Sequence, residues 1–136
     1  MPLVRIDLAD HHTPEQIRAI ADGVHQAIVD VLGIPERDRF QIITAHRPGE
    51  IVALDAGLGF DRSADVVMIH IFTQAGRSDT TKQDLFARIA ERLAGAGVDG
   101  RDIFVGITEN GPQDWSFGFG KAQYLTGELA IPSAAR

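Results

Sequence analysis

The sequence repeats itself at an interval of about 64 residues. Over residues 38–48 and 102–112, five of eleven aligned positions are identical: Asp38 and Asp102, Phe40 and Phe104, Ile43 and Ile107, Thr44 and Thr108, Pro48 and Pro112. Each of these segments follows a long amphipathic stretch, and each amphipathic stretch follows a short apolar run. A repeat with this internal order predicts two copies of one supersecondary unit.

Each unit predicts a strand, a helix and a second strand. Residues 2–8 alternate apolar and polar side chains, and residues 66–72 form a short apolar run, as strands do. Four signals mark the first helix: Thr13 as the N-cap, Pro14 at the first helical position, Gln16 three residues after the cap and Gly33 at the end. The second helix is predicted from an N-cap at Ser78, an apolar face of Leu85, Phe86, Ile89, Ala90 and Leu93, and stop signals at Gly95 and Gly97.

Two tandem β-α-β units predict one α/β domain over residues 1–136, with units at about 2–48 and 66–112. Each unit contributes two parallel strands and a helix that crosses over them. With both helices on one face, the other face of the four-stranded sheet is left bare. Its strands are rich in Val, Ile and Phe, so we expect the protein to associate through it.

Composition excludes several classes of function. The chain has 136 residues, a net charge of −6 and no cysteine, so disulfides and thiolate metal sites are excluded and a cytoplasmic location is expected. The negative charge argues against nucleic acid as a partner. No apolar run approaches the roughly 20 residues that span a bilayer, and no secretory signal precedes the first strand. The expected partner is a small molecule or another copy of the chain.

The familiar catalytic and metal motifs are absent from the sequence. Five histidines are present, but none has the spacing of a metal site, and the adjacent pair His11 and His12 would not share a helix or strand face. No P-loop, HExxH or GxSxG motif occurs. We therefore expect no metal and no organic cofactor.

Pro2 is the remaining candidate for chemistry. Once Met1 is removed, its secondary amine would be held at the start of a strand. The reference pKa of an α-amino group is about 8, and a site can tune it, so such an amine can act as base, acid or imine-forming nucleophile.

The chain resembles the tautomerase superfamily, the group of 4-oxalocrotonate tautomerase and macrophage migration inhibitory factor, and within it the malonate semialdehyde decarboxylases. The resemblance runs almost end to end. It rests on PLVRIDL at the start, IPERDRFQIITAHRP in the middle, GRS before the second helix and ITENGPQDWSFGFGKAQYLTGELA near the end.

This resemblance implies a homotrimer, a second unit antiparallel to the first, and a set of site residues. Pro2 would be the catalytic amine, Asp38 its acidic partner and Arg77 the group that binds the substrate carboxylate. Trp115 and Phe117 would form an apolar wall, and residues 113–136 would supply this wall and trimer contacts. The chain departs from the family pattern in one respect, because a single arginine stands where two are expected. Either Gln74 substitutes by hydrogen bonding, or the carboxylate is held less tightly, at a cost of ten- to hundredfold.

Each of these residues also has a purely structural interpretation. Asp38 could cap a turn beside Arg37 or Arg39, and Arg77 could pair with Asp79. Trp115 and Phe117 could belong to the core or to a trimer interface.

The leading functional hypothesis is cofactor-free decarboxylation of malonate semialdehyde to acetaldehyde and carbon dioxide, with Pro2 as general acid. The alternatives are a tautomerase or hydratase of acids such as phenylenolpyruvate or 2-oxo-3-pentynoate, and a non-catalytic trimeric binding protein. A Pro2 pKa above neutrality would favour the acid role, and one well below it the base role.

Overall fold

The computed structural model describes residues 2–131. Its elements follow the order expected from the repeat. They are β1 (Leu3–Ala9), α1 (Pro14–Leu32), β2 (Phe40–His46), β3 (Val67–Gln74), α2 (Asp79–Gly95), the 3-10 turn η1 (Gly100–Asp102), β4 (Ile103–Asn110), the 3-10 turn η2 (Pro112–Asp114) and α3 (Gln123–Thr126). β1 and β3 begin 64 residues apart, at Leu3 and Val67.

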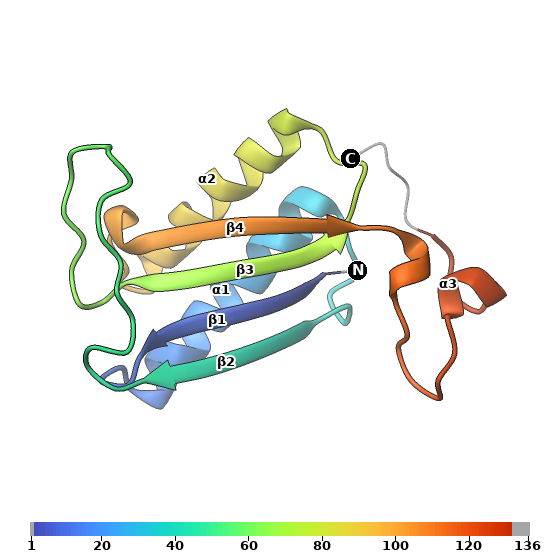
Figure 1. Ribbon diagram of the computed structural model, residues 1–136, viewed down its shortest axis with the longest axis horizontal. Helices are drawn as coiled ribbons and strands as arrows, with labels where there is room; N and C mark the ends of the chain where they lie inside the picture. Colours follow the sequence, from blue (N-terminus) through green and yellow to red (C-terminus); the bar gives the residue numbers. More distant parts are fainter. Residues whose placement is uncertain (1, 132–136) are drawn as a thin grey trace.

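The four strands form one mixed sheet in the order β2-β1-β3-β4 (Figure 1). β1 is parallel to β2 and β3 is parallel to β4, as two β-α-β units require. The two units meet through β1 and β3, which are antiparallel, with Ile6 opposite Ile69. The predicted four-stranded mixed sheet is therefore confirmed.

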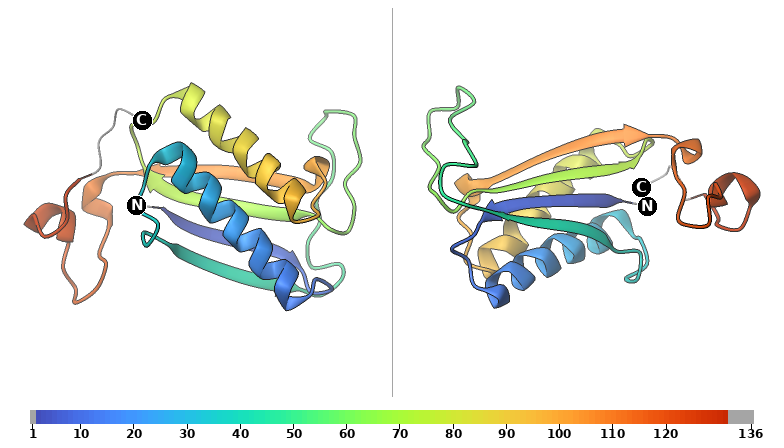
Figure 2. Two further views of the ribbon diagram at one scale, coloured as in Figure 1. Left: turned by 180° about the vertical axis from the view of Figure 1, so that it is seen from behind. Right: turned by 60° about the horizontal axis from the view of Figure 1, so that its bottom comes forward.

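Both helices cover the same face of the sheet, and the core lies between the two layers (Figure 2). The predicted caps are confirmed: Thr13 Oγ1 accepts a hydrogen bond from the Gln16 amide, and Ser78 Oγ accepts one from the Thr81 amide. Gly33 ends α1 in the left-handed conformation, with φ of 70°, where glycine carries no steric penalty. None of the helices between residues 2 and 131 is long and apolar enough to cross a membrane.

One residue predicted for the buried face of α2, Phe86, is partly exposed. Phe86 is 38% exposed, whereas Leu85, Ile89 and Leu93 are buried. Successive helical residues are about 100° apart, so a residue next to Leu85 lies at the margin of the face that Leu85 buries.

The second face of the sheet is uncovered in the single chain (Figure 1). Phe40 and Ile42 on β2 and Phe104 on β4 project from it with 45%, 43% and 44% of their surface exposed. Polar side chains lie among them, including His46, whose Nε2 is 2.6 Å from Asp7 Oδ1. This face is thus apolar in part, as the strand composition predicted.

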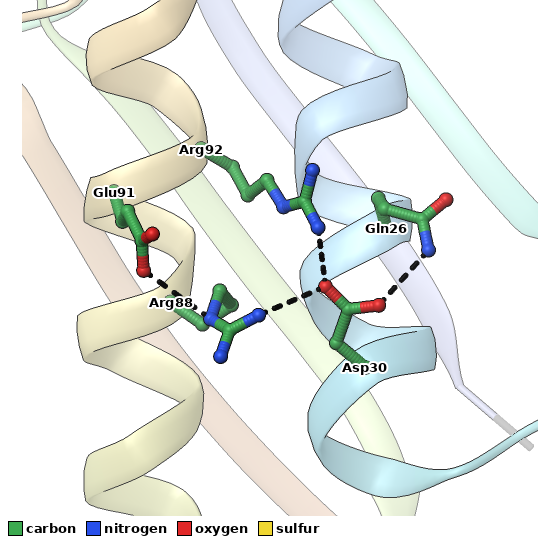
Figure 3. Close-up of polar contacts among 5 residues, drawn as sticks. All are labelled: Gln26, Asp30, Arg88, Glu91 and Arg92. Carbon is green, nitrogen blue, oxygen red and sulfur yellow. Dashed lines mark hydrogen bonds and ion pairs between the residues drawn. The ribbon is translucent and has the colours of Figure 1, made fainter.

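A polar cluster joins the outer surfaces of the two helices (Figure 3). Asp30 on α1 receives hydrogen bonds from Gln26 at 3.0 Å, from Arg92 at 2.6 Å and from Arg88 at 3.1 Å, the two arginines belonging to α2. The bonds from Gln26 and Arg92 hold the pKa of Asp30 below its usual value, and the charges of both arginines add to them.

This lowered pKa predicts a pH-dependent contribution to stability. Because the folded-state pKa of Asp30 lies below the unfolded value, its contribution is present above that value and is lost as the pH falls through the folded pKa. We expect Asp30→Asn to lower the urea midpoint at neutral pH. The difference from the parent should shrink as the pH falls below about 4. Glu91→Gln is a matched control, because Glu91 contacts only Arg88 in this cluster and is 74% exposed. An Asp30→Asn effect that is unchanged at low pH would contradict this account.

Candidate active site

Pro2 lies buried immediately before β1. The next residue, Leu3, is opposite Phe40 on β2 and opposite Phe72 on β3. Pro2 therefore lies at the sheet edge where β1 and β2 begin and β3 ends, as expected from its place in the sequence. Met1, whose removal would free the amine of Pro2, is outside the described residues.

Asp38 lies at the same edge, in the turn that leads into β2. Its amide donates to the carbonyl of Pro35 at 3.0 Å, while its Oδ1 is buried without a hydrogen-bond partner among the described residues. Burial raises the pKa of Asp38, and nearby positive charges, Arg77 among them, act in the opposite direction. The neighbouring Arg39 donates to Asp22 Oδ1 and Gln41 Oε1 rather than to Asp38.

Arg77 lies in the connection from β3 to α2. Its Nη1 donates to Thr73 Oγ1 at 2.9 Å and to the carbonyl of Gln74 at 3.2 Å, rather than to Asp79. Arg77 Nε is buried and unpartnered within the described chain, and so is Nε2 of Gln74, a residue only 5% exposed. Buried donors without partners are costly and rare in folded proteins, so they mark a place where a ligand can bind.

Electrostatic effects link these groups with two further residues. Burial lowers the pKa of Arg77, whereas the negative charges of Glu109, Tyr124 and Asp38 raise it. Glu109, on β4, also pairs with Lys82 at 2.8 Å. The site thus combines one partly buried cation, Arg77, with two acidic side chains, Glu109 and Asp38, that are close enough to act on its pKa.

The two aromatic residues predicted to form a wall, Trp115 and Phe117, stack on each other beyond the end of β4. The rings of Trp115 and Phe117 are parallel to within 3°, with centroids 5.8 Å apart, and Phe40 lies 6.2 Å from Phe117. Trp115 Nε1 donates to Asn110 Oδ1 at 2.8 Å, which ties the stack to the last residue of β4. This segment lies at the same end of the sheet as the start of β1 (Figure 1).

Tyr124, in the short helix α3, lies near these groups although it is not among the predicted site residues. Tyr124 is 4% exposed, and its ring packs edge-on against Phe117 at 5.3 Å. Burial raises the pKa of Tyr124, the charge of Asp38 raises it further, and that of Arg77 lowers it. No periodicity could have identified this residue, because the chain after Pro112 belongs to neither repeat.

Comparison with known proteins places the chain among the tautomerases. Two family models described as "Tautomerase enzyme" match residues 38–118 and 2–61. The curated "Probable tautomerase YrdN" of Bacillus subtilis is 37% identical over 130 residues, which cover 95% of this chain and all of that protein.

Solved structures give the same result. An FG41 malonate semialdehyde decarboxylase inhibited by 3-bromopropiolate is 66% identical, with a TM-score of 0.93 over 96% of this chain and 99% of that one. A second malonate semialdehyde decarboxylase, described with decarboxylase and hydratase activities, is 39% identical, with a TM-score of 0.89 over 94% and 99% of the two chains. A fused 4-OT described as a symmetric trimer shares the fold at 21% identity, with a TM-score of 0.76 over 92% and 98% of the chains.

The electrostatic coupling of Tyr124 to Asp38 can be measured directly. We expect Asp38→Asn to lower the pKa of Tyr124, because it removes one of the two causes that raise it. Tyr124 is the only tyrosine in the sequence, so tyrosinate absorbance as a function of pH reports on it alone. Asp84→Asn, an equal charge change on the exposed surface of α2, should leave the pKa unchanged. Equal effects of the two variants would refute the coupling.

Proposed function

The chain belongs to the tautomerase superfamily, a family of enzymes, and on that premise we propose that it decarboxylates malonate semialdehyde to acetaldehyde and carbon dioxide. The observation that carries the proposal is a set of buried, unpartnered polar atoms at the sheet edge where Pro2 lies. They belong to Asp38, Gln74 and Arg77. A small polar ligand would supply the missing partners.

The substrate is proposed to be a three-carbon acid. Arg77 and Gln74 offer a cation and an amide donor to a carboxylate, and guanidinium groups suit carboxylates well. The 66% identical malonate semialdehyde decarboxylase is inhibited by 3-bromopropiolate, which is also a three-carbon carboxylate. The two acids share the carboxylate and the chain length that these donors would recognise.

The proposed mechanism uses Pro2 as the acid. The bond between the carboxylate carbon C1 and C2 breaks as carbon dioxide leaves. Its electron pair forms the C2–C3 double bond of an enolate, and the negative charge moves to the aldehyde oxygen on C3. A protonated Pro2 amine donates a hydrogen bond to the aldehyde oxygen, where the negative charge develops. A proton then adds to C2 and gives acetaldehyde. An iminium formed between Pro2 and the aldehyde would accept the same electron pair.

The surrounding residues would hold this geometry. Arg77 fixes the carboxylate so that the breaking bond stands perpendicular to the carbonyl plane. Trp115 and Phe117 keep water from the reacting carbons, which strengthens the hydrogen bonds within the site. Asp38 orients the amine of Pro2 as its negative partner.

Gln74 is proposed to replace the second arginine of the family pattern. Its buried Nε2 has no partner among residues 2–131, so it can donate to the substrate without giving up an existing bond. A neutral hydrogen bond contributes about 0.5–1.5 kcal/mol and a charged one about 1.5–3 kcal/mol. The substitution therefore favours weaker carboxylate binding rather than loss of the reaction.

Hydration is the second candidate activity. Asp38 could position a water for attack on an unsaturated acid such as 2-oxo-3-pentynoate, while Pro2 protonates the adjacent carbon. The 39% identical relative is described with both decarboxylase and hydratase activities, which supports hydration as the second candidate activity. A tautomerase reaction on phenylenolpyruvate would instead require a neutral Pro2.

The active unit is proposed to be a homotrimer. The uncovered sheet face exposes Phe40, Ile42 and Phe104, and burying such side chains contributes about 25 cal/mol for each Å². The fused 4-OT with this fold is described as a symmetric trimer. A trimer would cover the apolar face of each copy.

Kinetics of two variants test the catalytic proposal. Pro2→Ala should lower kcat about a hundredfold, the lower end of a general acid's contribution, because a primary amine remains at the site. Arg77→Ala should raise KM about ten- to hundredfold, because a charged hydrogen bond to the carboxylate is lost. Proton NMR of acetaldehyde formation from malonate semialdehyde measures both effects.

The control for these variants is Arg18→Ala, which removes an exposed arginine of α1 and should leave both constants unchanged. Parent-like turnover by both Pro2→Ala and Arg77→Ala would refute the proposed mechanism. Absence of acetaldehyde from the parent, with hydration of 2-oxo-3-pentynoate retained, would favour the second candidate. Intact mass must show that Met1 is absent from active protein, because an acylated Pro2 nitrogen is not basic.

Sedimentation equilibrium tests the assembly. The parent should have the mass of three chains of about 14.7 kDa each. Phe104→Glu places a charge on the uncovered face and should shift the protein towards monomers. Phe86→Glu makes the same change on the exposed side of α2 and should leave the trimer intact. A monomeric parent would overturn this part of the proposal.

A further inference from the structure

The second β-α-β unit creates a counterpart of the candidate active site at the opposite end of the sheet. In the candidate active site, β1 and β2 begin beside the turn that follows β3. At the opposite end, β3 and β4 begin beside the turn that follows β1. Asp102, the repeat partner of Asp38, lies at this second end, and His11 and His12 occupy the turn after β1.

Three potential metal ligands meet there. His11, His12 and Asp65 each offer one ligand atom, and these atoms lie within 4.8 Å of one another. His11 Nε2 is 2.5 Å from Asp65 Oδ1, and the two side chains are about half exposed, at 51% and 57%. His11 and Asp65 are 54 residues apart in the sequence, so residue spacing alone could not reveal the group.

His12 provides the independent observation. It is only 7% exposed, yet neither of its ring nitrogens has a hydrogen-bond partner in the described part of the chain. Its ring stacks on that of His11, with centroids 4.6 Å apart, so it is held against the group. A neutral imidazole always has one nitrogen with a free lone pair, and burial without a partner is costly for it. A metal ion would satisfy that lone pair.

The backbone that carries Asp65 is held in place by a buried carboxylate. Asp102 is 2% exposed and accepts two hydrogen bonds from Ser63, from its amide at 2.7 Å and from its hydroxyl at 2.6 Å. Ser63 Oγ in turn accepts from the Asp65 amide at 3.0 Å. Supporting hydrogen bonds of this kind hold metal ligands in position.

We propose that His11, His12 and Asp65 bind one divalent transition-metal ion of the zinc class. Two imidazoles and a carboxylate suit zinc, which takes such ligands at about 2.0–2.2 Å in tetrahedral geometry. Tetrahedral ligand atoms are then about 3.4 Å apart. The hydrogen-bonded atoms of His11 and Asp65 have to move apart by about 1 Å, and ligand atoms as far as 4.8 Å apart have to approach. The half-exposed His11 ring also has to turn out of its stack on His12, because an ion lies in the plane of each imidazole that binds it. Water can occupy the fourth position, since His11 also lines a cavity of about 400 Å³.

The role of this ion is structural. It links the turn between β1 and α1 to the segment before β3, and so fastens the two repeats together at the end of the sheet remote from Pro2. The proposed decarboxylation uses none of these residues. An ion that binds the folded state and not the unfolded one raises stability by mass action.

Calorimetric titration with Zn²⁺ tests the site on the tag-free, chelator-treated full chain. One ion per chain is expected. Asp65→Asn and His12→Ala should each weaken binding at least tenfold, because loss even of a supporting residue costs ten- to hundredfold in metal affinity. The parent should also show a Zn²⁺-dependent rise in Tm that Asp65→Asn reduces. If His12→Ala does not fold, Asp65→Asn alone decides, because Asp65 is on the surface.

Asp61→Asn is the matched control, an equal charge change at an exposed position of the same loop, and it should bind Zn²⁺ as the parent does. His46→Gln tests the other histidine–aspartate pair, His46 with Asp7, and should also leave binding unchanged. No binding by the parent, or equal affinity in Asp65→Asn and Asp61→Asn, overturns the proposal. So does loss of binding in His46→Gln.

Discussion

The antiparallel pairing of β1 with β3 is the constraint on which the rest of the molecule depends. It joins the two repeats into one sheet, with Val4 opposite Ile71 and Ile6 opposite Ile69. All four of these side chains are buried under the helices. A slip of one residue would turn them to the uncovered face, so the register is strongly specified. The same pairing places the start of β1 beside the end of β3. It therefore brings the segment that carries Gln74 and Arg77 close to Pro2. Core and candidate site are therefore fixed by the same hydrogen bonds.

Local chemistry made much of the fold predictable. Caps at Thr13 and Ser78 and the glycine stop at Gly33 act through bonds within a few residues, so sequence spacing reveals them. The sheet edge that gathers Pro2, Asp38 and Arg77 was harder to foresee, since residues alone do not say that the units run antiparallel. That expectation came from resemblance to a family. Tyr124 could not be predicted, because it reaches the site through a short helix outside both repeats. The group of His11, His12 and Asp65 could not be predicted for a similar reason, since these residues come together only once the chain has folded.

The equivalent aspartates of the two repeats differ in their hydrogen bonding. Asp102 is satisfied by two hydrogen bonds from Ser63, and it holds the segment before β3. Asp38 keeps a buried oxygen without a partner among the described residues, and burial raises its pKa. A buried unsatisfied oxygen costs stability, and such costs are characteristic of functional sites. The difference follows from position in the chain. At an offset of 64 the counterpart of Pro2 is Val66, an internal residue with an ordinary peptide nitrogen. In the proposed mechanism the unpaired carboxylate of Asp38 serves the amine of Pro2, for which Val66 offers no counterpart.

The aromatic wall connects the candidate site to the uncovered face of the sheet. The wall has no strand to support it, and side-chain bonds hold it instead: Trp115 to Asn110, and Gln123 to the backbone of Phe117 and Gly118. The ring of Phe117 packs against those of both Tyr124 and Phe40. Phe40 is at the same time one of the exposed side chains of the uncovered face, with 45% of its surface accessible. Whatever covers that face also restricts Phe40, and through it the stack of Phe117 and Trp115. In the proposed mechanism, assembly and the exclusion of water from the site would therefore be coupled through Phe40.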